Sequence, residues 1–207
     1  MTKNKSKASQ ATTEPLSAQQ VYELTSQVLA EHLQLDMSNS DYEVDDIWDV
    51  LVAAAVQRLT IETASKLLES TPSPNTVRNA VYDLLGDDEQ LAQLESILNE
   101  MLLARLPKKL MHKARPCAAD FTEIPYQGRH EAEDDLFRRG RAKSGTTRFH
   151  CYATLYIVNN HKRYTLALTL VRRSDSALDA LKRLVVRSEE VGLRIKRLYL
   201  EVLLHLS

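Results

Sequence analysis

Cysteine and long apolar runs are both scarce in this 207-residue chain. Cys117 and Cys151 are the only cysteines, and neither belongs to a Cys-x-x-Cys pair or has a closely spaced histidine. This pattern argues against a disulfide scaffold and against a zinc site. In the apolar part of the first half, the longest uncharged stretch is residues 50–57, far short of the roughly 20 residues that span a bilayer. The sequence therefore predicts a protein with no membrane contact.

The N-terminus lacks the apolar core of a secretory signal. Lys3, Lys5 and Lys7 are followed by Ser, Gln and Thr residues. We expect residues 1–16 to be a disordered tail and the protein to be cytoplasmic. With 27% charged and 43% hydrophobic residues, the remainder fits a globular chain of one or two domains.

Charge is distributed unevenly, although the net charge is only -1. Residues 1–104 hold 6 basic and 17 acidic side chains, whereas residues 105–207 hold 21 basic and 11 acidic ones. Two dense clusters favour contact with a phosphate backbone, because Lys and Arg are its chief ligands. Solvated faces, or pairing with the acidic first half, are the alternatives. The clusters are Arg105, Lys108, Lys109, Lys113 and Arg115, and then Arg138, Arg139, Arg141, Lys143 and Arg148.

Glycine is absent before Gly86, which favours a helical first half. Apolar periodicity predicts a helical domain over residues 17–107. Ser17 is placed to cap the first helix, with Gln20 completing a capping box. Trp48, Val52 and Val56 are predicted to form the inner face of the second helix. The predicted helices span residues 17–35, 45–59, 61–69, 75–85 and 91–106.

Residues 61–85 are typical of a helix-turn-helix, with a break over residues 70–74. Arg and Asn side chains can form paired hydrogen bonds with guanine and adenine edges. We therefore predict DNA contacts from Asn75, Arg78 and Asn79. A proline-broken hairpin inside a helical bundle is the alternative, since the acidic residues from Asp83 to Glu89 would repel phosphate.

After Pro116 the pattern becomes alternating and β-branched, which predicts strands at residues 116–124, 146–158 and 163–171. A helix over residues 176–191, closed by Gly192, leads to a fourth strand at 195–200. The first three strands should form an antiparallel meander, with the fourth parallel to a neighbour. The expected fold class is α+β, with a helical DNA-binding region followed by a partial RNase H-like mixed sheet over residues 116–207.

Asp120 is unusual because it lies in mid-strand between Ala119 and Phe121, where aspartate is disfavoured unless a cation meets it. A catalytic metal would supply that cation. A capping role at a strand end, or pairing with a nearby arginine, is the alternative.

Residues 45–200 resemble the bacterial and archaeal insertion-sequence transposases of the DDE type. The resemblance is carried by the segments ADFTEIPY at 119–126, RGRAKSGTT at 139–147, FHCYATLY at 149–156, RYTLAL at 163–168 and RLYL at 197–200. It implies an RNase H-like domain whose three acidic residues hold two Mg²⁺ or Mn²⁺ ions for DNA cleavage and strand transfer. Asp120 would be the first acid and a metal ligand, and Lys143 with its neighbouring arginines would contact the DNA backbone. The preceding region would bind the terminal inverted repeats.

The chain departs from the family pattern after Leu200, where Glu201 replaces the expected aspartate and no third acid follows. Glu201 is thus a candidate second acid, or the product of a deletion. We expect a truncated, inactive transposase that forms a homodimer or pairs with a full-length copy. A non-catalytic fragment that occupies transposon ends and inhibits the full enzyme is the alternative. A third hypothesis is poor folding, caused by exposure of Leu198, Leu200, Val202, Leu203, Leu204 and Leu206.

Overall fold

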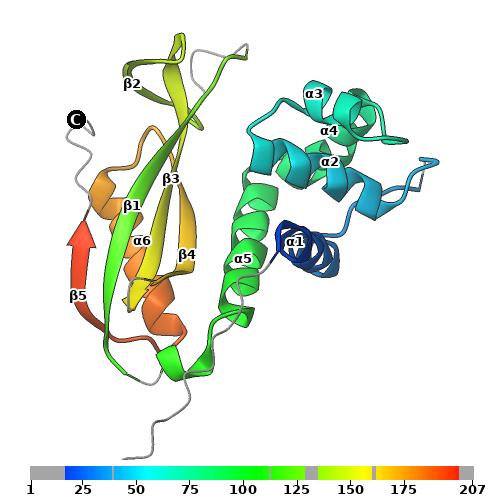
Figure 1. Ribbon diagram of the computed structural model, residues 1–207. Helices are drawn as coiled ribbons and strands as arrows, with labels where there is room; N and C mark the ends of the chain where they lie inside the picture. The colour runs from blue at the N-terminus through cyan, green and yellow to red at the C-terminus, as the bar shows by residue number, and fades with distance from the viewer. Residues whose placement is uncertain (1–16, 39, 112, 129–134, 160–161, 201–207) are drawn as a thin grey trace, which may run out of the picture. The chain divides into compact units, whose positions relative to one another are not determined.

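The structure is a computed structural model that describes residues 17–38, 40–111, 113–128, 135–159 and 162–200 (Figure 1). The chain divides into two compact units, Met1–Asp83 and Leu84–Ser207. Each unit is described by itself below. Together, the described residues form a mixed α+β fold with six α-helices and five strands.

The first unit is helical, as predicted. It contains α1 (Ala18–His32), α2 (Val44–Gln57), α3 (Ile61–Leu67) and most of α4 (Pro74–Leu85). The capping box of α1 is confirmed: the Ser17 N–H donates to Gln20 Oε1 at 2.9 Å, and the Gln20 N–H donates to Ser17 Oγ at 3.2 Å. These bonds satisfy N–H groups that the first helical turn leaves without a partner.

The inner face of α2 was predicted only in part. Trp48 and Val52 are buried, but Val56 is 75% exposed. The prediction for Val56 is wrong because this residue lies in the last turn, beyond the buried positions of the helix, which extend from Ile47 to Ala54.

The second unit contains α5 (Asp88–Ala104), a short 3-10 helix (Lys108–Leu110), β1 (Arg115–Pro125), β2 (Arg138–Lys143), β3 (Thr146–Asn159), β4 (Lys162–Val171), α6 (Ala177–Glu190) and β5 (Ile195–Leu200). β3 pairs antiparallel with both β1 and β4, and β5 pairs parallel with β1. The predicted meander with a parallel fourth strand is therefore confirmed. The β2 strand was not predicted.

One long strand, β3, organises the curled sheet because its two edges are used differently. One edge pairs with β1, whereas the other pairs first with β2 and then with β4. Cys151, Ala153, Leu155 and Ile157 of β3 are buried at every second position, as the strand period of two requires. They form a core with Ala180 and Leu184 of α6, which therefore covers this face of the sheet.

Helix α5 lies along β4 in the second unit (Figure 1), although the sequence had placed it with the preceding helices. Polar side chains of α5 form hydrogen bonds with the backbone of β4, as a neighbouring strand would. Asn99 Nδ2 donates to Leu168 O at 3.0 Å, and Asn99 Oδ1 accepts from the Leu168 N–H at 2.8 Å. Glu95 Oε2 accepts from the Leu170 N–H at 2.8 Å.

This contact is geometrically favourable, because four helical residues rise about 6 Å and two strand residues advance about 6.8 Å. Glu95 and Asn99, which are four residues apart on α5, therefore meet alternate residues of β4. Backbone groups that an edge strand would leave unpaired are satisfied by this helix.

Two further findings concern membrane-spanning helices and the exposure of the apolar C-terminal residues. No helix among the described residues is long and apolar enough to cross a membrane. Of the apolar C-terminal set, Leu198 packs against the core and Leu200 is 48% exposed. Val202, Leu203, Leu204 and Leu206 lie outside the described residues.

Candidate functional site

Asp120 lies in the middle of β1 on the sheet face opposite α6. Its neighbours Ala119 and Phe121 point into the core, so alternation turns the Asp120 side chain to the other face, where it is half-buried. Asp120 pairs with Thr154 of β3, and Leu200, at the end of β5, pairs with Ala119. The last described residue of the parallel strand therefore pairs with the residue next to the predicted first acid.

The second acid cannot be placed in the same way, since Glu201 lies outside the described residues. Within the part of the chain that the structure describes, no group of three or more His, Cys, Asp or Glu side chains could hold a metal ion. A two-metal centre needs several carboxylate oxygens around each cation. The described residues on their own do not fit such a centre.

The second basic cluster forms a β-hairpin, which we call the basic arm: β2, the turn at Ser144 and Gly145, and residues 146–149 of β3. Both turn residues have positive φ, 54° and 79°, as a two-residue hairpin turn that matches the strand twist requires. Gly140 lies against Phe149, where an added Cβ would come within 3.1 Å of the ring. The arm is thus a paired structure and not a loose charged loop.

Most cationic side chains of the basic arm are exposed to solvent. Arg139, Arg141 and Lys143 are exposed and Arg148 is half-buried. Arg139 lies directly opposite Arg148 in the hairpin register.

The pairing register of the strands shows which face of the sheet the basic arm and Asp120 share. Directly paired residues share a face, so Asp120 with Thr154, and Arg139 with Arg148, lie on the sheet face opposite α6. The six-residue separation of Arg148 and Thr154 along β3 corresponds to about 20 Å. One face of the sheet therefore carries both the candidate acid and the paired arginines.

Arg138 differs from the other arm cations. It pairs with the buried Phe149 and so lies on the α6 side of the sheet. Its Nη1 donates to Arg172 O at 2.8 Å and to Asp175 O at 2.6 Å. The fold already engages the guanidinium that the sequence had assigned to DNA.

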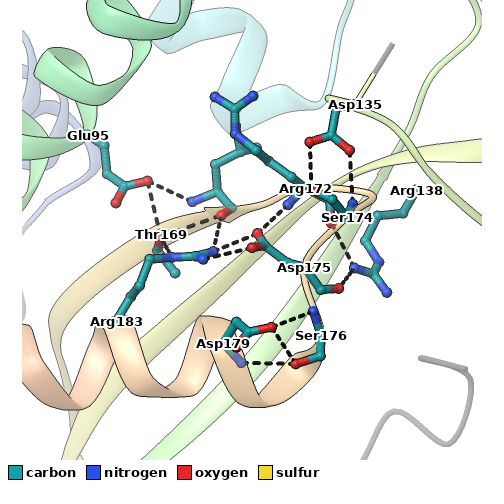
Figure 2. A network of polar contacts seen from close by, with 11 residues as sticks. Glu95, Asp135, Arg138, Thr169, Arg172, Ser174, Asp175, Ser176, Asp179 and Arg183 are labelled. Carbon is teal, nitrogen blue, oxygen red and sulfur yellow. Dashed lines mark hydrogen bonds and ion pairs between the residues drawn. The ribbon is translucent and has the colours of Figure 1, made fainter. Parts of the chain in front are cut away.

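Figure 2 shows the polar network around this contact. Asp175 is held by the Arg183 guanidinium through two bonds of 2.9 and 2.8 Å, and its Oδ2 accepts from the Arg172 N–H at 2.8 Å. Arg183 also donates to Leu170 O at 2.8 Å. Asp135 accepts from the Ser174 N–H and hydroxyl at 2.9 and 2.7 Å. The connection from β4 to α6 is therefore bonded to both α6 and the root of the basic arm.

Hydrogen bonding from Arg183 lowers the pKa of Asp175 from its ordinary value near 3.8, which makes the stability of the second unit depend on acid pH. A carboxyl whose pKa is depressed by folding stabilises the native state above its unfolded pKa, and this stabilisation is lost as pH falls through the folded pKa. We expect Asp175→Asn to lower the unfolding free energy at pH 7 and to lower it less at pH 3. Urea unfolding at the two pH values measures both differences, and equal differences would contradict the assignment.

In the first unit, the predicted recognition residues on α4 have mostly local or acidic surroundings. Arg78 forms an ion pair with Glu62 of α3, and its Nη1 donates to Asn75 Oδ1 at 3.0 Å. Asn79 is exposed, but it lines a surface pocket together with Asp36 and Asp41. The helix pair exists as predicted, while these neighbours reduce the cationic character that phosphate binding requires.

The two cysteines are not candidate nucleophiles. Both thiols are free and buried, and burial raises the pKa of each to about 11. Thiols with such a pKa remain protonated near neutral pH and are poor nucleophiles.

Comparison with known proteins adds no relative. The chain matches no protein-family model, no curated protein and no solved structure. The candidate site therefore depends on the geometry above and on the motif resemblance.

Proposed function

We propose that this chain is a DNA-binding protein of the insertion-sequence DDE transposase type, with the N-terminal part of an RNase H-like domain in its second unit. The observation that carries the proposal is the position of Asp120, in mid-strand on the sheet face opposite α6 and next to the pair of Ala119 with Leu200 of the parallel strand β5. The strand order β4, β3, β1, β5 supports the RNase H-like assignment.

The basic arm supplies the electrostatics that DNA binding needs. Arg139, Arg141 and Lys143 are exposed, and Arg139 shares the face of Asp120. The separation of about 20 Å between the paired arginines and Thr154 corresponds to the axial rise of roughly six base pairs of duplex DNA, at 3.4 Å each. A duplex along β3 could therefore contact both regions at once.

Cleavage is not part of the function proposed for the described residues. Mg²⁺ or Mn²⁺ would have Asp120 as one ligand, but two-metal phosphoryl transfer needs further carboxylates. A metal site that is incomplete among the described residues, together with the basic arm, favours a second role: occupying terminal inverted repeats as a homodimer or beside a full-length transposase, and so inhibiting transposition.

We expect no metal-dependent nicking by this chain alone. Supercoiled plasmid incubated with purified protein and Mg²⁺ or Mn²⁺ should remain supercoiled, because the described residues bring no further acids together with Asp120 to hold two cations. The Asp120→Asn protein is the control for contaminating nuclease. Nicking by the natural protein that disappears in this variant would contradict the expectation.

DNA binding is tested with duplexes that carry the inverted repeats flanking the gene, against scrambled duplexes of equal length. The proposal predicts binding that weakens as salt increases, because Lys and Arg contacts release counterions from DNA. Stronger binding to the repeats would support end recognition. Absence of binding to either duplex at low salt would refute the proposal.

A further inference from the structure

The root of the basic arm coincides with a change of strand partner on β3. Phe149 pairs with Arg138 of β2, and Cys151, two residues later, pairs with Val171 at the end of β4. No backbone pairing between β2 and β4 is recorded among the described residues. Two backbone bonds hold the root of the arm: the Tyr126 N–H donates to Arg148 O at 2.9 Å, and the Arg173 N–H donates to Asp135 O at 2.8 Å. Side chains add to these bonds between β2 and the residues that follow β4.

Arg138 makes one of these side-chain connections. Its Nη1 lies within hydrogen-bond distance of two carbonyl oxygens that follow β4, at 2.8 Å from Arg172 O and 2.6 Å from Asp175 O. One end of the bridge is the first residue of β2, and the other is the turn that leads to α6 (Figure 2).

Asp175 holds the other end of this bridge in place. Its carboxylate receives the two bonds from Arg183 of α6 and one from the Arg172 N–H, so the two carbonyls that accept from Arg138 flank a connection tied to α6. A bidentate Arg–carboxylate pair has a defined geometry and so restrains the turn.

We propose that Arg138 and Asp175 are positioning residues that hold the basic arm in the orientation required for DNA. This inference rests on the proposed function, since it assigns the DNA contacts to Arg139, Arg141 and Lys143 and gives Arg138 an indirect role. Loss of either positioning residue leaves the contacting cations in place but lets the arm move. DNA binding then carries the entropic cost of ordering the arm, which lowers the affinity.

Asp175→Asn distinguishes a direct DNA contact by Arg138 from a positioning role, because the two predict opposite changes in DNA affinity. Removing an acidic charge near a DNA-binding surface strengthens binding if Arg138 is freed to contact phosphate. The positioning role predicts instead that Asp175→Asn and Arg138→Met both weaken binding to a 30-base-pair duplex by about fivefold. Arg138→Lys, which keeps donors for the carbonyls, should recover much of the loss. Glu189→Gln, an exposed acid-to-amide change on α6, is the matched control and should not weaken binding.

Amide hydrogen exchange of the full-length variants provides a readout that does not depend on DNA. Arg138→Met and Asp175→Asn should accelerate exchange over residues 139–148 by about tenfold, with smaller changes in α6 for Arg138→Met. Unchanged exchange in the arm, or faster exchange with unchanged affinity, would overturn the inference. If Asp175→Asn unfolds α6, Arg138→Met, which retains the Asp175–Arg183 pair, decides the question.

Failure of the proposed function has a different signature. In that case Arg139→Gln leaves duplex binding unchanged, whatever the exchange of the arm shows. Stronger binding by Asp175→Asn, with Arg139→Gln still weakening it, would refute only the positioning role.

Discussion

Replacing Asn99 with leucine is expected to destabilise the second unit by about 3 kcal/mol, because two backbone groups of β4 lose their partners. Asn99 is 5% exposed, and its amide both donates to and accepts from Leu168. Leucine has nearly the same shape but offers neither bond. The cost therefore comes from unpaired polar groups and not from a cavity. Urea unfolding followed by circular dichroism measures the loss.

Gln93→Leu is the matched control, since it makes a similar polar-to-apolar change at an exposed position of α5. Its effect should remain within about 0.5 kcal/mol. The fluorescence of Trp48, in the first unit, serves as an internal reference for that unit. Equal effects of Asn99→Leu and Gln93→Leu would contradict the role of α5 as the partner of the sheet edge.

Removing the three exposed cations of the basic arm should have the largest effect on DNA affinity. Each phosphate contact contributes about 0.9 to the slope of log affinity against log salt concentration for duplex DNA. The variant with Arg139→Gln, Arg141→Gln and Lys143→Gln should therefore lose a slope of about 2.7 and bind far more weakly at low salt. Fluorescence anisotropy with a labelled duplex at four salt concentrations measures both quantities.

A second triple variant separates site-specific contact from the loss of net charge. Lys162, Lys182 and Arg194 are exposed in the second unit and lie outside the basic arm. Their replacement by glutamine removes the same total charge. An equal decrease in slope for both triple variants would show that no particular surface binds DNA, and would contradict the arm assignment.

Alternating hydrophobicity was sufficient to predict the strands that contribute to the core. β1, β3, β4 and β5 all begin and end within one residue of their predicted limits. Along β3 and the second half of β4 the buried positions recur with period two, so burial and sequence carry the same signal there. α6 likewise begins and ends within one residue of the predicted helix over residues 176–191.

β2 was missed because its sequence, RRGRAK, has no β-branched or aromatic residue and no apolar alternation. It is a strand because the turn at Ser144 and Gly145 folds it back onto β3. The basic residues Arg139, Arg141 and Lys143 occupy every second position, and this alternation could have indicated a strand. Arg138 is out of phase with Arg139, and this difference anticipates its separate role.

The partnership of α5 with β4 could not be inferred from local pattern. Glu95 and Asn99 are ordinary polar residues of a helix, and their four-residue spacing acquires meaning only beside an unpaired strand edge. A helix that satisfies backbone groups 69 residues away in the chain is a tertiary feature. The ion pair of Arg78 with Glu62 is likewise visible only once α3 and α4 are placed.

Covalent crosslinking of the natural protein to an inverted-repeat duplex, followed by peptide mapping, tests the central claim most directly. If the basic arm binds DNA, crosslinked peptides will come from residues 138–148 and will be lost in the triple arm variant. Crosslinks confined to residues 61–85, or no crosslinks at all at low salt, would contradict DNA binding by the basic arm.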